Sequence, residues 1–138
     1  MIVTDCERIG QWVSEKAGGT YTGQAAIGVE HKGVLVAGVI YNDFTGGSII
    51  MGSRIDSPYG LKEFYWFAFY YPFMQLGVKN VRGVVSVLNH KAQRLNEHLG
   101  FTREAILRDY FPEADAIIYV MAKDECRFLK EDYAPKFN

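Results

Sequence analysis

The sequence has little cysteine, little proline and almost no net charge. It contains two cysteines and four prolines in 138 residues, and its 15 basic and 16 acidic side chains leave a formal charge of −1. The cysteines show no C-x-x-C or zinc-ligand spacing, so we expect neither a disulfide framework nor a metal site. The charge balance excludes a strongly basic nucleic-acid-binding chain. The N-terminal residues lack the apolar core of a signal peptide, which predicts a reducing, cytoplasmic location.

Long apolar runs are also missing. Eight of the ten residues at 64–73 are aromatic, but this cluster is too short to cross a bilayer, which needs about 20 apolar residues. A base-stacking surface is disfavoured because no basic groove accompanies the rings. The cluster is therefore interpreted as a core helix, with a protein–protein surface as the alternative. The chain length and a hydrophobic content of 49% predict a single domain over residues 1–138.

Apolar periodicity and turn residues predict an alternating order of elements. The expected helices cover 5–17, 61–76 and 90–99, and the expected strands cover 25–30, 34–41, 48–55, 80–88, 101–110 and 116–123, followed by a helical turn within 124–129. Asp5 is expected to cap the first helix and Gly18-Gly19 to end it. Pro72 is expected to kink the aromatic helix, because proline lacks the N–H that bonds one turn back.

This order predicts an α/β (α+β) fold with a mixed, mostly antiparallel sheet of about six strands and helices on both faces. Strands 48–55 and 80–88 should be parallel, since a helix joins them by a right-handed crossover. Ligands bind such sheets at the carboxyl ends of parallel strands.

On the aromatic helix, the spacing predicts two faces. Phe64, Phe67 and Tyr71 are expected on the sheet, and a second face is left for a partner, most simply a second copy of the chain; that second face consists of Tyr65, Phe69 and Phe73.

One segment carries a recognisable pattern. Residues 89–101, NHKAQRLNEHLGF, resemble the N-x-x-A-x-x-L-x-x-x-L-G-F segment of the GNAT superfamily of acetyl-CoA-dependent acyltransferases. Residues 75–81 resemble the helix-to-strand join of that family, and residues 104–108 resemble the E-G-x-L-R segment of its ribosomal-protein Nα-acetyltransferase branch. Residues 115–129 look like the end of small GNAT-like proteins of phages and prophages. The expected order of elements also matches the family.

The resemblance implies an N-acetyltransferase that moves an acetyl group from acetyl-CoA to a primary amine of a small molecule or a protein N-terminus, by direct attack. Acetyl-CoA would lie between strands 48–55 and 80–88. The strand backbone would hold the pantetheine arm, and the start of the following helix would hold the pyrophosphate. The implied cofactor-binding residues are Met51, Ser53, Ser57, Tyr59, Gly60, Lys62, Asn89, Ala92 and Asn96.

The motif indicates the catalytic residues less specifically than it indicates the cofactor-binding residues. Asn89 lies where a strand gives way to a helix, and its amide can both donate and accept hydrogen bonds. Asp56 is the first candidate for the base that takes the amine proton. The further candidates near the expected cleft are Asp43, His31, His90 and Tyr119.

Three positions in two segments depart from the family. The pyrophosphate loop [RQ]-x-x-G-x-[GA] corresponds here to residues 57–62, with Ser57 at the first position and Lys62 at the last. Asn96 stands where many members use a tyrosine to protonate the product thiolate, and an amide cannot supply that proton. These departures support an alternative hypothesis, in which the protein is a catalytically inactive GNAT-fold binding module, for example a phage accessory factor.

Overall fold

The computed structural model describes residues 1–17 and 25–135. The first part contains strand β1 (Ile2–Val3) and helix α1 (Cys6–Ala17). The Asp5 carboxylate accepts a hydrogen bond from the Arg8 N–H at 3.2 Å, which confirms the predicted cap. The predicted end of this helix at Gly18-Gly19 lies outside the described residues.

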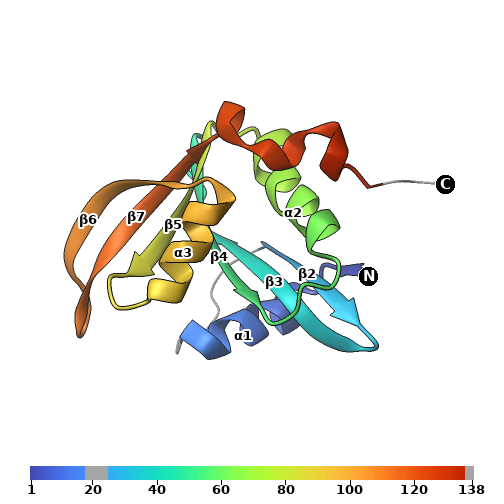
Figure 1. The fold of residues 1–138 in the computed structure, drawn as a ribbon, viewed down its shortest axis with the longest axis horizontal. Helices are drawn as coiled ribbons and strands as arrows, with labels where there is room; N and C mark the ends of the chain where they lie inside the picture. Colours follow the sequence, from blue (N-terminus) through green and yellow to red (C-terminus); the bar gives the residue numbers. More distant parts are fainter. Residues whose placement is uncertain (18–24, 136–138) are drawn as a thin grey trace.

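The predicted strands and helices are confirmed within a few residues (Figure 1). After α1 the chain forms β2 (Ala25–His31), β3 (Val34–Asn42), β4 (Ser48–Ile55), α2 (Leu61–Tyr70), a π-helical turn η1 (Tyr71–Gln75), β5 (Asn80–Ser86), α3 (His90–Leu99), β6 (Thr102–Phe111) and β7 (Ala114–Ala122). The C-terminal segment, residues 123–135, contains the 3-10 turns η2 (Lys123–Glu125), η3 (Arg127–Leu129) and η4 (Glu131–Tyr133).

The strands form one mixed sheet in the order β1-β2-β3-β4-β5-β7-β6. Among the strands of residues 1–17 and 25–135, only β4 and β5 are parallel, and the other neighbours are antiparallel. The sheet therefore has seven described strands rather than about six, because Ile2 and Val3 pair with Val29 and Gly28 at one edge. No helix among the described residues is long and apolar enough to cross a membrane.

Helices cover both faces of the sheet, as predicted (Figure 1). Helix α1 lies on one face of β2 and β3, where Ile9 is fully buried. It approaches closely because Gly28 and Gly38 are paired across the two strands. A β-carbon on Gly38 would lie 3.0 Å from methyl carbons of Ile9 and Val13. The absence of side chains at Gly28 and Gly38 thus lets α1 pack closely on β2 and β3.

The aromatic helix α2 packs on the other face, but not as predicted. Phe64, Phe69 and Phe73 are the buried rings, each 1% exposed, whereas Phe67 and Tyr71 are half-buried. The predicted partner-facing set is therefore wrong for Phe69 and Phe73. The reason is that the C-terminal segment folds back over α2, so that Phe128 stacks on Phe69 with ring centroids 5.1 Å apart.

Pro72 interrupts α2 as predicted. The regular helix ends at Tyr70, and the Leu76 N–H donates to the Tyr71 carbonyl, five residues back, at 3.0 Å. In an α-helix residue 72 would donate to the Ala68 carbonyl, which proline cannot do. The buried Tyr41 hydroxyl donates to that carbonyl instead, at 2.5 Å. A strand thereby supplies the hydrogen bond that the helix cannot make.

Candidate functional site

The two parallel strands separate at the centre of the sheet. Ser48, Ile49 and Ile50 pair with residues 80–82, and the ladder stops there, although β4 continues to Ile55 and β5 to Ser86. Each strand keeps its antiparallel neighbour over this stretch, β4 with β3 and β5 with β7. Beyond that pair the inner edges of β4 and β5 make no ladder hydrogen bonds to each other, and this separation is called the opening below. Such an opened edge can accept an extended ligand.

Three residues meet near the apex of this opening. A β-carbon on Gly83 would lie 3.2 Å from Oδ1 of Asn96 and 3.8 Å from the Met51 carbonyl oxygen. The structure thus brings two of the predicted cofactor-binding residues, Met51 and Asn96, to one place. Gly83 was missed by sequence reasoning, although an isolated glycine in a valine-rich strand is the usual sign of a close backbone approach.

Asn89 caps helix α3, which begins where β5 ends. Its Oδ1 accepts from the Ala92 N–H at 3.1 Å, so the side-chain oxygen is engaged and the Nδ2 group is the part that can donate to a ligand. Asn96 lies further along α3, and its Nδ2 donates to the Ala92 carbonyl at 2.8 Å. Three predicted site residues therefore lie on one helix beside the opening.

The loop between β4 and α2 is compact. The Tyr59 N–H donates to Oγ of Ser57 at 3.2 Å, and Gly60 has a φ of 68°, a left-handed conformation that favours glycine. Helix α2 starts at Leu61 with no side-chain cap. Its first-turn N–H groups therefore carry the partial positive charge that suits an anion.

A groove of about 420 Å³ lies between this end of α2, the last turn of α3 and the C-terminal segment. Lys62 and Arg127 are its basic residues beside His98. Lys62 Nζ lies 5.9 Å from the ring centroid of Tyr133, which borders the same groove. The predicted phosphate-binding residue Lys62 is thus exposed at a concave surface that also carries one acidic residue, Asp132.

The sequence matches no protein-family model and no curated protein sequence. The fold, in contrast, matches solved structures. A SpeG spermidine N-acetyltransferase chimera of Vibrio cholerae and hSSAT has a TM-score of 0.63 at 20% identity, covering 77% of this chain and 70% of that chain. A protein of T. thermophilus assigned as an acetyltransferase has a TM-score of 0.64 at 20% identity, covering 79% and 64%. The dodecameric spermidine N-acetyltransferase of Vibrio cholerae has a TM-score of 0.63 at 21% identity, covering 72% and 65%.

The chain shares the fold of these acetyltransferases. The opening between β4 and β5 lies at the place where the sequence resemblance put acetyl-CoA.

Asp56, the predicted base, directly follows β4 and forms an ion pair. Both of its oxygens accept from Arg54, at 3.2 and 2.8 Å, and Lys16 lies 3.6 Å away. The hydrogen bonds from Arg54 hold the pKa of Asp56 below its usual range, with Lys16 adding to the effect. A base for an amine proton needs a pKa nearer to neutrality, so this geometry favours a structural role for Asp56.

Tyr119 is a further candidate that the fold places beside α3. It is fully buried, and its hydroxyl donates to Oε2 of Glu97 at 2.8 Å. Burial first, and the bond to Glu97 second, raise the pKa of Tyr119, which keeps the hydroxyl protonated at neutral pH. His90 and Asp43 are exposed, and the His31 ring packs on the Tyr59 ring with centroids 3.9 Å apart.

Proposed function

We propose that this protein is an acetyl-CoA-dependent N-acetyltransferase that acetylates a primary amine. The observation that carries the proposal is the opening of the only parallel strand pair among the described strands, β4 and β5, within a GNAT fold. The neighbours named as spermidine N-acetyltransferases support an amine acceptor. A small polyamine-like molecule and a protein N-terminus are both acceptors of this class.

The residues present fit acetyl-CoA. The free edge of β4 from Met51 onward offers backbone groups to a pantetheine arm, and the missing side chain of Gly83 lets Asn96 of α3 approach the same place. The uncapped start of α2, with Lys62 beside it, fits a pyrophosphate. When bound, the cofactor supplies an activated thioester carbonyl.

The chemistry needs little from the protein beyond orientation and proton movement. A bond forms between the amine nitrogen and the acetyl carbon, the carbon–sulfur bond breaks, and one proton passes from the amine to the thiolate. We assign Nδ2 of Asn89 as a hydrogen-bond donor within the cleft, because its Oδ1 is held by the α3 cap. Since Asn96 cannot act as an acid and Asp56 is ion-paired, we assign the proton transfer to water in the opening.

A catalytically inactive binding module remains the second candidate, favoured by the observation that Asn96 stands at the acid position and is hydrogen-bonded to the helix backbone. In that case the same cleft would hold a ligand without turnover, as a phage accessory factor could do. Binding and turnover therefore have to be measured separately.

Calorimetric titration with acetyl-CoA, followed by mass spectrometry of amines incubated with it, tests the proposal. We expect saturable binding and an acceptor whose mass rises by one acetyl group. Binding without any product from spermidine, smaller diamines or N-terminal peptides would establish the binding-module alternative. No heat and no thermal shift at millimolar acetyl-CoA would refute both.

Asn89→Asp tests the assigned amide donor. The aspartate keeps the cap acceptor for the Ala92 N–H, so the unfolding free energy should be preserved, whereas the Nδ2 donor is lost. We expect kcat/KM to fall about 10- to 100-fold. Asn89→Ala is the companion variant, because it should also destabilise the protein by about 1 kcal/mol through loss of the cap. An Asn89→Asp protein with full activity would remove Asn89 from the mechanism.

We further propose a cytoplasmic protein that forms a homodimer. The cytoplasmic location rests on the two cysteines, Cys6 and Cys126, which form no disulfide. The dimer rests on edge strand β6, where Ile106, Leu107 and Tyr110 are 53%, 39% and 54% exposed. Sedimentation velocity of the wild-type protein tests the dimer, and a strict monomer at micromolar concentration would remove it.

A further inference from the structure

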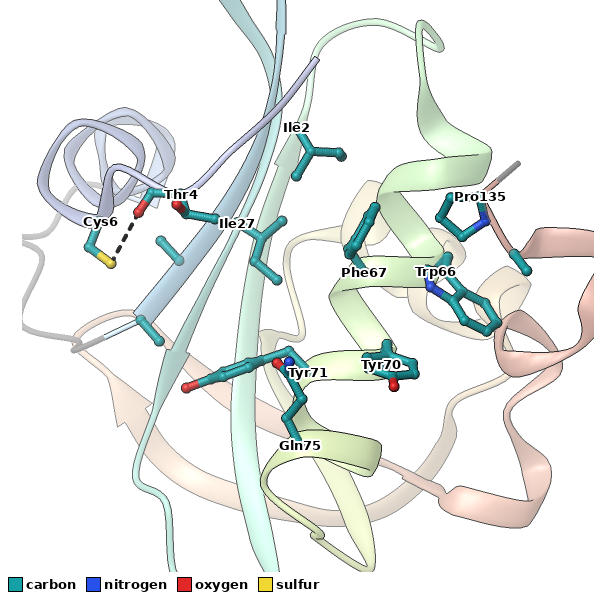
Figure 2. Close-up of a pocket in the computed structure, with 13 residues that line it drawn as sticks. Ile2, Thr4, Cys6, Ile27, Trp66, Phe67, Tyr70, Tyr71, Gln75 and Pro135 are labelled. Atoms are coloured by element: carbon teal, nitrogen blue, oxygen red, sulfur yellow. Dashed lines mark hydrogen bonds between the residues drawn. The ribbon is translucent and has the colours of Figure 1, made fainter. Parts of the chain in front are cut away.

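A second concave site lies on α2, apart from the opening between β4 and β5. It is a cavity of about 650 Å³ between β1–β2 on one side and residues 134–135 on the other (Figure 2). It shares no lining residue with the groove between α2 and α3. The two sites therefore use different faces of the same helix.

Aromatic rings from α2 and the start of η1 form the floor of this cavity. Trp66, Phe67, Tyr70 and Tyr71 line it, at positions i, i+1, i+4 and i+5 of the helix. Figure 2 shows Phe67 and Tyr71 on the side of the strands and Trp66 and Tyr70 on the side of Pro135. The rings of Trp66 and Tyr70 stack, with centroids 5.4 Å apart and planes at 27°. The floor therefore presents two pairs of rings, one toward the strands and one toward Pro135.

The walls of the cavity are made of small and aliphatic side chains. Ile2 and Ile27 stand on the strand side, and Ala134 and Pro135 stand on the other side. None of the described residues that line the cavity is Lys, Arg, His, Asp or Glu. Side-chain hydrogen-bonding groups are limited to hydroxyls, the thiol, the indole N–H and the amide of Gln75 at one end. A charged ligand would lose its hydration here without gaining an ionic partner.

We propose that this cavity binds a neutral, ring-containing small molecule. Its volume falls within the range of about 300–1,000 Å³ that is typical of small-molecule pockets. Four rings on the floor provide stacking contacts for a planar ligand, and the uncharged walls match an uncharged one. The hollow shape fits a small molecule better than the flat surface of a second protein chain. This site goes beyond the proposed acetyltransferase activity and does not depend on it.

The test uses N-phenyl-1-naphthylamine, a neutral aromatic probe whose emission rises in apolar sites. The chain has two tryptophans, so Trp12→Phe leaves Trp66 as the only energy donor. We expect saturable binding of one probe per chain, with energy transfer from Trp66. Tyr70→Ala removes one ring of the floor and should weaken binding about tenfold. Phe44→Ala, which removes a ring at an exposed site between β3 and β4, is the matched control and should change it less than twofold.

Each outcome decides the proposal. Absence of saturable binding to the wild-type protein would overturn it, and so would equal losses in Tyr70→Ala and Phe44→Ala. Displacement of the probe by coenzyme A would place the probe in the acetyl-CoA cleft and would also overturn it. Probe binding that is lost as the protein self-associates would assign the cavity to a second copy. Failure of acetyl-CoA to bind would leave the comparison of Tyr70→Ala with Phe44→Ala fully informative.

Discussion

The hydrogen bond from Tyr41 to the Ala68 carbonyl should stabilise the protein because Pro72 leaves that carbonyl without its α-helical donor. In Tyr41→Phe the buried carbonyl loses this partner. A buried polar group deprived of its partner costs about 1–3 kcal/mol. For 138 residues, an unfolding entropy of about 2.1 cal/mol/K per residue gives about 0.3 kcal/mol per degree. We therefore expect the Tm to fall by about 3–10 °C.

The assay is a double-mutant cycle in urea, followed by circular dichroism. Pro72→Ala restores a backbone N–H at the position that can donate to Ala68. Tyr41→Phe should therefore cost about 1 kcal/mol less in the Pro72→Ala background than in the wild type. Tyr110→Phe removes an exposed hydroxyl and serves as the control. Equal costs of Tyr41→Phe in the two backgrounds would refute the compensation between tyrosine and proline.

Three further substitutions test the opening between β4 and β5, the packing of α1 and the ion pair of Asp56. Gly47→Ala is the control for the substitutions at Gly83 and Gly38, because a β-carbon on Gly47 would meet nothing within 4 Å. Gly83→Ala should weaken acetyl-CoA binding about tenfold in calorimetry, and unchanged affinity would contradict the placement of the ligand between β4 and β5. Gly38→Ala should destabilise by about 1–3 kcal/mol through overpacking in urea denaturation, and a neutral result would mean that α1 shifts freely. Asp56→Asn should lower the free energy of unfolding at pH 7. Because Arg54 holds the pKa of Asp56 low, this difference from wild type should shrink as the pH falls below about 4. A difference that stays constant from pH 7 to pH 2 would exclude the ion pair as its source.

Local features of the site were predictable from sequence. Asn89 caps the helix that follows strand β5 through a contact with a residue three positions later. Capping signals act over this range, so the end of the strand and the start of the helix could be predicted. The kink at Pro72 depends on one missing N–H. The parallel arrangement of residues 48–55 and 80–88 followed from the crossover rule, although where their pairing stops did not.

Other features depend on contacts distant in sequence. Phe69 is buried by Phe128, and no periodicity within α2 reveals a ring that arrives 59 positions later. Position 83 requires glycine because Asn96 on the facing helix approaches it closely. The weakness of Asp56 as a base comes from Arg54, which lies two residues away but is held under α1, where its guanidinium lies 4.0 Å from the Trp12 ring centroid. In each case the tertiary neighbour, not the local pattern, sets the role.

The return of the C-terminal segment over α2 has a consequence for how the protein is made. During synthesis, α2 emerges with Phe69 and its neighbouring rings long before Phe128 can reach them. Until the chain has been extended through Tyr133, which packs on Phe128 with ring centroids 5.1 Å apart, an aromatic surface stays open to chaperones or to other nascent chains. Completion of this layer is therefore a late step of biosynthesis, and ribosome-bound chains halted before residue 128 should be the most aggregation-prone.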